Sequence, residues 1–440
     1  MFDPFDIRDT YTSWQVSICT LLIYALFYST LHNATQKLYY TLFILFFWVY
    51  SGVGIGYVKG VHKDYELHYY IFLAAFSVSY RFFLLLTPRL GKVIAESTGS
   101  FFTSFTNRNW LVYSVFAAYV LAAAIPLMFP TFQLYKLISP PAPDIAAEFK
   151  ARFGGGGEYD QPIRKIAANV TFLLYPFYLM GVYNFRHRLL LLIILLALPL
   201  YMNYCLVSYA GRSEIISVLL IFFSIVWFYN QKLRKFLVVA SFVLAPLLLS
   251  FSYYYTQLRA GEKVKTTKSL EKKVSNVVIF VETSFPTFSR KIFDRENDFN
   301  IKNFYFWFVT LPIPKVLIGK VPPASPTADI AEILLGKRMG TPGFFILLTG
   351  LVTESVYIYG KNFSFIHAII IALVLSLLAR LTEGNPILFS LTIVYALLMG
   401  YSLNRAGFVG PMAIVINQFF SFYLLVLFLV LKRLISLSSK

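Results

Sequence analysis

Long apolar segments separated by short polar or charged turns make up most of this 440-residue sequence. An α-helix needs about 20 mainly apolar residues to cross the hydrocarbon part of a bilayer. By that measure the pattern predicts about eleven transmembrane helices, at 11–31, 39–57, 67–86, 110–130, 167–185, 189–209, 213–229, 236–255, 363–380, 386–403 and 411–431. The predicted fold is an all-α polytopic membrane protein, with residues 1–440 forming a single integral membrane domain.

A twelfth apolar stretch, 343–360, is interrupted by Gly350 and Glu354 and ends at Gly360. A charged side chain is unfavourable in the middle of a lipid-facing helix. We therefore expect a re-entrant or interfacial segment here rather than a full crossing.

Lys and Arg residues in the short turns give the orientation, because such residues concentrate on the cytoplasmic side. With the N-terminus outside, an eleven-helix path puts every basic turn in the cytoplasm: Arg89 to Arg108, Arg186 to Arg188, Lys232 to Lys235, and Lys432 with Arg433. A full crossing at 343–360 would turn the last of these outward, which favours the re-entrant interpretation.

The composition supports a membrane protein and narrows its ligands. The chain is 58% hydrophobic and 14% charged, and a soluble protein is usually about one quarter charged. Its net charge of +18 exceeds what cytoplasmic anchoring requires and indicates an anionic ligand or lipid headgroup, not nucleic acid. Cys19 and Cys205 lie in apolar runs without the spacing of a metal site, and no cofactor is expected.

Two sizeable loops fall on the outer side, at 131–166 and at 256–345. The smaller contains four consecutive glycines, Gly154 to Gly157, which are typical of a flexible linker. The larger holds fourteen Lys or Arg residues against eight Asp or Glu residues, a net charge of +6. Long loops escape the positive-inside rule, so this charge needs a functional explanation.

Three outer turns each carry an arginine at one membrane level: Arg212, Arg259 and Arg405. A guanidinium keeps its charge and presents a fork of donors that matches phosphate oxygens. Together these arginines suit a pyrophosphate whose lipid tail stays in the membrane. Two of them also have a plainer interpretation, since Arg212 can pair with Glu214 and Arg259 with Glu262, whereas Arg405 has no acidic neighbour in the sequence.

Glu354 is the second candidate for the same layer, because a carboxylate at membrane depth marks a functional site by default. It is either a general base for a sugar hydroxyl or a group that holds one of the arginines in place. We take Glu354 and Arg405 as the catalytic candidates. His367 begins the following helix near this layer, and a structural role is favoured for it.

The large loop adds basic pairs at Arg290-Lys291 and Lys337-Arg338, and we include Arg290, Lys291 and Arg338 among the candidates for binding the pyrophosphate. Aromatic residues near them suit either sugar stacking or a helix lying on the membrane. The acidic run from Asp294 to Asp298 lacks the glycine and distal Glu of an EF-hand, so a solvated charge run is expected and no metal site.

The order of these parts resembles the bacterial O-antigen and capsule repeat-unit polymerases, the Wzy family, which are grouped with the O-antigen ligases. Three pieces carry the resemblance along most of the chain: Gly211-Arg212-Ser213, the segment GTPGFFILLTGLVTESVYIYG, and Arg405-Ala406-Gly407. In the last of these, Ala406 interrupts the family's usual Arg-Gly pair.

The resemblance implies a metal-independent glycosyltransferase of the GT-C-like kind in the bacterial inner (cytoplasmic) membrane, acting in lipopolysaccharide or other polysaccharide biosynthesis. Its active site would lie on the outer, periplasmic face. The donor would be a glycan on undecaprenyl pyrophosphate, and the acceptor a repeat unit on the same carrier. Other implied partners are membrane lipids, a chain-length regulator and a flippase.

Two alternatives stay open. An O-antigen ligase would use the same donor and a different lipid acceptor, and is expected to depend on a histidine in the outer loop; residues 256–345 contain none. A transporter or flippase for lipid-linked oligosaccharides would be expected to show internal repeats and charges at mid-membrane, which the sequence lacks.

Overall fold

The structure, a computed structural model, describes residues 10–56, 61–129, 132–142, 162–208, 212–240, 285–295, 301–310, 326–338 and 349–438. Every regular element in these ranges is a helix. Arg259, the glycines at 154–157, most of the predicted helix 236–255 and most of both outer loops lie outside the described residues.

Seven helices in the described ranges are long and apolar enough to cross a membrane, or up to nine if each of two bent pairs is one span. The seven are Ala34–Gly56, Tyr65–Leu86, Asn109–Met128, Ile166–Phe185, Leu189–Leu206, Phe365–Thr382 and Pro386–Ala406. The bent pairs are Glu214–Tyr229 with Gln231–Ala240, at 116°, and Val409–Gln418 with Phe420–Ser436, at 53°. The chain is thus a multi-pass membrane protein.

Two helices in the N-terminal half of the chain differ from the pattern of transmembrane spans that the sequence predicts. Helix α1 (Thr10–Ser29) coincides with the predicted span 11–31, but its Thr, Ser and Gln residues leave it less apolar than the seven. Helix α4 (Pro88–Asn107) occupies a stretch that the hydrophobic pattern treats as a loop. It is amphipathic, with Ile94, Phe102 and Phe105 buried, so it never presents 20 consecutive apolar residues.

The chain divides into two compact units. The first comprises Met1–Ala95, Val278–Gly384 and Tyr395–Asn417, and the second comprises Glu96–Val277, Asn385–Val394 and Gln418–Lys440.

The first unit is built around helices α2 (Ala34–Phe47), α3 (Tyr65–Leu86) and α17 (Phe365–Thr382), with α17 packed along α3. Its core is a stack of aromatic rings: Phe43 lies on Phe76 at 3.8 Å between centroids, and Phe47 lies on Phe72 at 4.9 Å. Offset aromatic pairs add about 0.5–1.5 kcal/mol beyond the burial of their area. These contacts fix the helices on which the candidate site is built.

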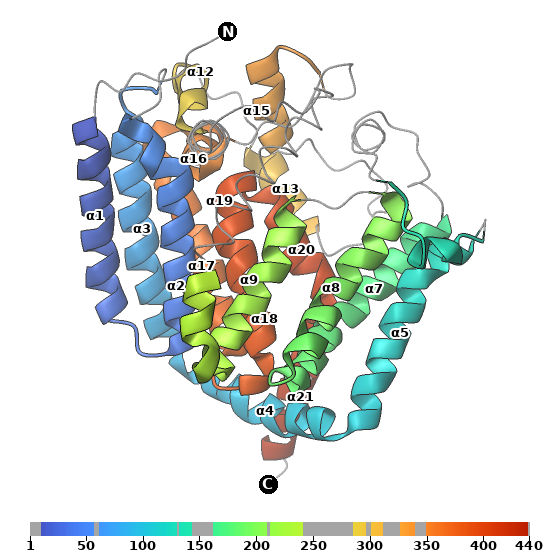
Figure 1. The fold of residues 1–440 in the computed structure, drawn as a ribbon. Helices are drawn as coiled ribbons and strands as arrows, with labels where there is room; N and C mark the ends of the chain where they lie inside the picture. Colours follow the sequence, from blue (N-terminus) through green and yellow to red (C-terminus); the bar gives the residue numbers. More distant parts are fainter. Residues whose placement is uncertain are drawn as a thin grey trace. The chain divides into compact units, whose positions relative to one another are not determined.

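Shorter helices gather at one end of the first unit (Figure 1). They are η9 (Phe285–Phe288), α12 (Ser289–Phe293), α13 (Ile301–Thr310), α15 (Pro326–Leu335) and α16 (Gly350–Phe363). At 14 residues, α16 is shorter than the roughly 20 residues of a crossing. The predicted re-entrant segment begins before it, at residues 343–348, outside the described residues.

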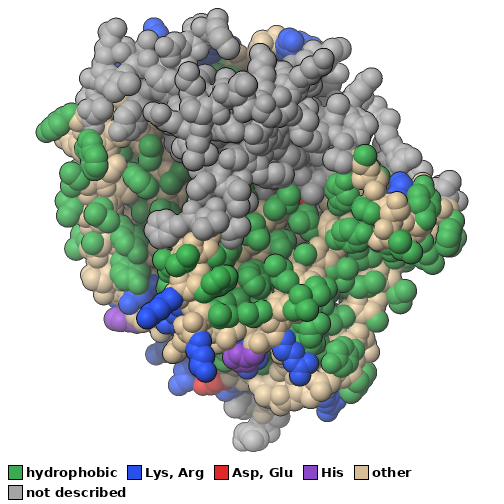
Figure 2. All heavy atoms as spheres, in the orientation of Figure 1, with side chains coloured by type: hydrophobic (Ala, Val, Ile, Leu, Met, Phe, Trp, Pro, Cys, Tyr) green, Lys and Arg blue, Asp and Glu red, His purple; other side chains and the backbone are tan. Residues whose placement is uncertain are grey.

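The second unit contains α5 (Asn109–Met128), α7 (Pro162–Val182), α8 (Leu189–Val207), α9 (Arg212–Tyr229) and α21 (Phe420–Ser438). Hydrogen bonds join its basic turns at one end. Asn184 donates to the Thr106 carbonyl at 3.0 Å, and Asn230 donates to the Arg186 carbonyl at 3.5 Å. Figure 2 shows Lys and Arg side chains at the lower ends of α8 and α9. Arg212 begins α9 at the opposite end from these turns.

Candidate functional site

The turn that carries Arg405 is a short helix between two irregular segments of the first unit. The π-helix η11 (Leu398–Ser402) leads into α19 (Leu403–Ala406), which ends at Gly407. Gly407 has φ +80°, a left-handed conformation that residues with a Cβ rarely adopt. The chain then reverses into α20 (Val409–Gln418). We refer to residues 403–408 as the Arg405 turn.

Glu354 of α16 holds this turn by its backbone. The Phe408 N–H donates to Glu354 Oε2 at 2.8 Å, and the Glu354 side chain is 1% exposed. A Cβ on Gly407 would lie 2.8 Å from the same oxygen. Only glycine therefore lets the turn approach the carboxylate closely enough for the hydrogen bond, and Glu354 and the Arg405 turn form one structural element.

Asn404 fixes the turn from a second side. Its buried amide donates to the Gly400 carbonyl in η11 at 2.6 Å and to the Phe43 carbonyl of α2 at 3.3 Å. Gly400 allows this approach, since a Cβ there would lie 3.0 Å from the Leu42 backbone. π-Helical segments often occur at functional sites. Here the segment is anchored through Asn404 to the core helix α2, next to Arg405.

His367 of α17 faces the other side of Glu354. Its Nε2 lies 3.8 Å from Glu354 Oε2, and its side chain has no solvent exposure. The ring is surrounded by aromatic rings, with Phe408 at 5.1 Å and Tyr359 at 5.8 Å between centroids. Among the residues that the structure describes, neither ring nitrogen has a hydrogen-bond partner, and neither does Glu354 Oε1. Buried polar groups are usually paired, so this site is under-satisfied.

Helix α13 covers the Glu354–His367 pair. Phe304 is buried and lies 6.4 Å from the His367 ring and 5.8 Å from the Phe408 ring, and Phe308 lies 5.5 Å from the Phe408 ring. The Tyr305 and Tyr359 hydroxyls are hydrogen-bonded at 3.2 Å. A helix of the long loop thus shields the pair with aromatic side chains.

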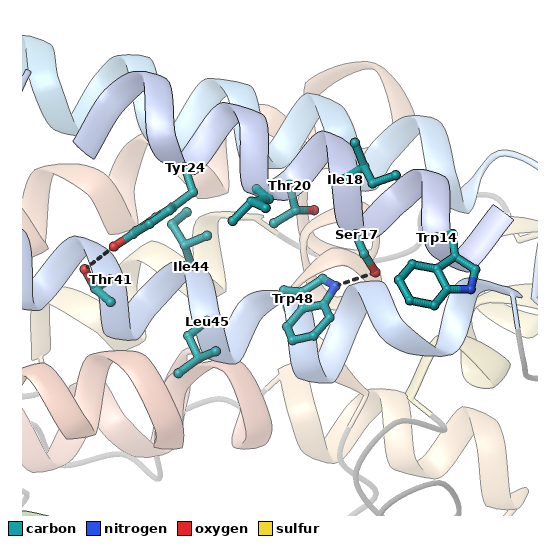
Figure 3. Close-up of a pocket in the computed structure, with 10 residues that line it drawn as sticks. Trp14, Ser17, Ile18, Thr20, Tyr24, Thr41, Ile44, Leu45 and Trp48 are labelled. Atoms are coloured by element: carbon teal, nitrogen blue, oxygen red, sulfur yellow. Dashed lines mark hydrogen bonds between the residues drawn. The ribbon is translucent and has the colours of Figure 1, made fainter. Parts of the chain in front are cut away.

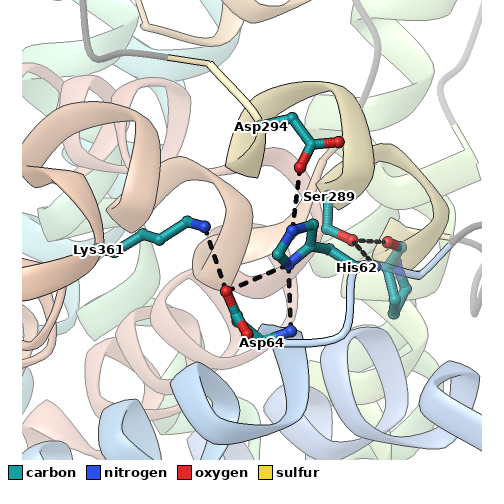
Figure 4. A network of polar contacts seen from close by, with 6 residues as sticks. His62, Asp64, Ser289, Asp294 and Lys361 are labelled. Carbon is teal, nitrogen blue, oxygen red and sulfur yellow. Dashed lines mark hydrogen bonds and ion pairs between the residues drawn. The ribbon is translucent and has the colours of Figure 1, made fainter.

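A polar network fastens α12 to the same end of the unit (Figure 4). Asp64 donates its N–H to His62 Nδ1 at 3.1 Å, so the other ring nitrogen of His62 carries the proton and donates to Asp294 at 3.1 Å. The His62 N–H donates to Ser289 Oγ at 3.0 Å. Lys361 donates to Asp64 at 3.2 Å, and this bond lowers the pKa of the Asp64 carboxyl below its ordinary value. The Asp294 side chain is 60% exposed, as expected in a solvated charge run, and its bond to His62 also anchors α12.

The three candidate basic residues of the long loop, Arg290, Lys291 and Arg338, lie on α12 or just beyond α15. Lys291 of α12 donates to the Leu334 carbonyl at 3.2 Å, at the C-terminal end of α15, where a cation is favourable. Arg290 is exposed on α12, and Arg338 is exposed just beyond α15. Half-burial beside Glu332 raises the pKa of Asp329 in α15 to about 6, with burial as the larger cause.

The structure joins only some of the predicted site residues. Glu354 contacts the Arg405 turn directly, and Arg290, Lys291 and Arg338 belong to the same unit. Arg212 belongs to the second unit, and Arg259 lies outside the described residues, so a cluster of three arginines stays a prediction. The hydrophobic pattern gave no indication of Asn404, His62 or the Phe408 N–H. Gly407, in the segment Arg405-Ala406-Gly407, was the sequence signal for a turn at this position.

An apolar groove opens between α1 and α2 in the first unit (Figure 3), with a volume of about 410 Å³. Apart from the exposed indole of Trp14, the polar side chains that line it are hydrogen-bonded to one another or to backbone. Trp48 Nε1 donates to Ser17 Oγ at 3.1 Å, and the Tyr24 and Thr41 hydroxyls are 3.0 Å apart. The groove therefore offers hydrocarbon contacts. Trp48 begins the π-helix η2 (Trp48–Gly52), which packs against α16 and α19.

In comparisons with protein-family models, with curated proteins and with solved structures, no match to this chain was found. Within the described residues, no three His, Cys, Asp or Glu side chains are grouped so that they could hold a metal ion. The geometry of the Arg405 turn is therefore the main observation from which a function can be argued.

Proposed function

We propose that the protein is a membrane glycosyltransferase that polymerises lipid-linked oligosaccharide repeat units. The donor is a glycan on undecaprenyl pyrophosphate, and the acceptor is the terminal sugar of another carrier-linked repeat unit. The observation that carries the proposal is the Arg405 turn, which Glu354 fixes by a buried hydrogen bond to the Phe408 N–H. A turn held this firmly keeps an arginine in place for an anionic group.

The transfer reaction depends more on stabilising the negative charge of the pyrophosphate leaving group than on a strong base. The oxygen of the acceptor hydroxyl bonds to the anomeric carbon of the donor as the bond from that carbon to the phosphate oxygen breaks. The electron pair leaves with the pyrophosphate, and the hydroxyl proton passes to solvent. Arg405 balances the charge that develops on the leaving group, as preorganised cationic groups do in other transferases. Arg212, Arg259, Arg290 and Arg338 are proposed to assist, without a metal.

Glu354 acts in this proposal by orienting the turn. Its Oε2 already accepts a backbone N–H, and α13 shields it, which favours a positioning role over general-base chemistry. The α1–α2 groove supports the proposal on the lipid side, because its paired polar groups leave apolar surface for an isoprenoid tail. We propose that the site faces the periplasm and that the helices belong to the GT-C-like class.

The test is a reconstituted reaction with purified protein in lipid and a synthetic undecaprenyl-pyrophosphate repeat unit, followed by gel separation of the glycans. The proposal predicts a ladder of increasing length that persists in the presence of a chelator. A single transfer to a different lipid acceptor would instead identify a ligase. Movement of intact substrate across vesicles without any new glycosidic bond would identify a transporter.

A further inference from the structure

His367 is one of the most enclosed polar residues among those that the structure describes. Its ring has no solvent exposure and packs among Phe72, Phe304, Tyr359 and Phe408. Both ring nitrogens lack hydrogen-bond partners within the described parts of the chain. A core histidine that served packing alone would gain from one hydrogen bond, as His68 does with Ser364 at 3.0 Å.

The ionisable side chain that lies against His367 is Glu354, with its Oε2 3.8 Å from His367 Nε2. A charged carboxylate without a compensating charge is strongly disfavoured away from water. An imidazolium beside it supplies that charge. If the proton lies on Glu354 instead, both groups are neutral. The pair is therefore neutral overall with either placement of the proton. The ionised placement desolvates two charges, and the hydrogen bond from the Phe408 N–H to Glu354 Oε2 favours it.

The placement of this proton matters for the Arg405 turn, because Glu354 Oε2 also accepts the Phe408 N–H at 2.8 Å. An ionised carboxylate forms a stronger hydrogen bond than a protonated one. The ring of Tyr359 in α16 also adjoins His367, at 5.8 Å between centroids, and His367 is the base that lies against Glu354 Oε2.

The geometry points to His367 as a positioning residue that keeps Glu354 ionised by holding the shared proton, and thereby holds the Arg405 turn in place through the Phe408 N–H. The structural part of this inference concerns only the proton and the turn. Its consequence for donor binding rests on the proposed function.

The first test is spectroscopic and needs no activity. Infrared difference spectra of purified protein at pH 7 identify the Glu354 carboxyl as the absorption lost in Glu354→Gln. In His367→Phe, which keeps an aromatic ring in the cavity, we expect the protonated carboxyl absorption of Glu354 to appear. The matched control is His68→Gln, which alters a buried histidine of the same unit that bonds Ser364 rather than Glu354. A carboxylate signal unchanged in His367→Phe would overturn the inference.

The second test uses the polymerisation reaction. We expect His367→Phe to raise the donor KM by about tenfold with a smaller change in kcat, and Glu354→Gln/His367→Phe to be no worse than His367→Phe alone. Independent effects in the double variant would contradict the coupling. If the infrared change appears but neither the wild-type protein nor any variant polymerises, the role of His367 in keeping Glu354 ionised is supported and the proposed function is contradicted. Equal thermal unfolding of His367→Phe and His68→Gln serves as the folding control.

Discussion

Helix α17 has a buried ionisable cluster near each end, and the two clusters are built in opposite ways. Near its C-terminal end, Arg380 donates to Glu383 at 2.7 Å and also to the Leu84 carbonyl of α3. Asn33 and Gln36, which flank the start of α2, donate to the same Glu383 carboxylate. Near its N-terminal end, His367 and Glu354 share one contact of 3.8 Å, and three of their polar atoms have no hydrogen-bond partner.

The difference between the two clusters indicates two roles, one structural and one functional. A buried charge that is paired and hydrogen-bonded on several sides joins helices and has little freedom to do anything else. The Arg380–Glu383 cluster links the α1–α2 turn, α2, α3 and α17 in this way. A buried carboxylate with spare bonding capacity is poorly explained by stability, and such under-satisfied groups concentrate at functional sites. We therefore assign a structural role to the Arg380–Glu383 cluster and a functional role to the Glu354–His367 cluster.

The largest effect is expected from breaking the Arg380 cluster. Arg380→Leu leaves the Glu383 carboxylate, whose side chain is only 17% exposed, without its cation. Removing one partner of a fully buried pair reduces stability by about 3–5 kcal/mol, and we expect the lower end of that range here. Thermal unfolding of detergent-purified protein should show a strongly lowered midpoint. The matched control, Arg81→Leu, changes a partly exposed arginine of α3 and should shift the midpoint little. Equal shifts in both variants would remove the distinction between the clusters.

The next effect is expected at Glu354 and concerns activity more than stability. Glu354→Leu removes the acceptor of the Phe408 N–H, and polymerisation should fall by about 100-fold, close to 2.7 kcal/mol. Glu354→Gln keeps an acceptor oxygen in the same place and should retain activity to within about tenfold of the wild type. Initial rates of glycan elongation measure both. Equal inactivation by Gln and Leu would show that the carboxylate acts as a base.

Gly407→Ala should have an intermediate effect on both stability and activity. At φ +80° an alanine is strained by about 1–2 kcal/mol, and its Cβ would also press on Glu354 Oε2. Chemical denaturation and elongation rates should decline together. Gly336→Ala is the control, because it also has a positive φ but has open space around the added Cβ. Activity should decline only in Gly407→Ala; a similar decline in both variants would argue that strain alone matters.

The smallest effect is expected at Asp329. The raised pKa of Asp329, about 6, means that the folded protein binds this proton more tightly than the unfolded chain does. The resulting stabilisation of the fold is fully present below about pH 4 and is lost as the pH rises through 6. Asp329→Asn should remove the penalty at neutral pH and stabilise the protein by about 1 kcal/mol, after allowance for solvent screening. Thermal midpoints at pH 5 and pH 8 should converge in the variant. A wild-type difference that persists in Asp329→Asn would contradict this.

The sequence pattern predicted the helical membrane architecture well where an apolar run approaches 20 residues. Each predicted span except 236–255 coincides with a described helix for most of its length. The hydrophobic pattern did not predict helix α4, because the apolar residues of this helix cover one face only. Eleven spans were predicted, and the described residues contain seven candidate spans, or up to nine if each of the pairs bent by 116° and 53° is one broken span rather than a re-entrant loop.

The site was harder to predict because its partners are distant in sequence. Glu354 and Phe408 are 54 positions apart, and His62 and Asp294 are 232 apart. Composition can identify an unusual carboxylate or a basic turn, as it did for Glu354 and Arg405. It cannot show that a backbone N–H is the partner, because every non-proline residue has one. His367 resembled an ordinary core histidine until its unpartnered nitrogens and the distance to Glu354 were known.

The central claim is that the Arg405 turn, held by Glu354, binds the pyrophosphate of a lipid-linked donor. The most direct measurement is the Kd of undecaprenyl pyrophosphate for purified wild-type protein, Arg405→Ala and the control Arg81→Ala in lipid nanodiscs. The claim predicts that Arg405→Ala raises the Kd by at least about tenfold, equivalent to 1.4 kcal/mol, with an unchanged thermal midpoint, while Arg81→Ala binds like the wild type. Equal Kd values for Arg405→Ala and the wild type would contradict it.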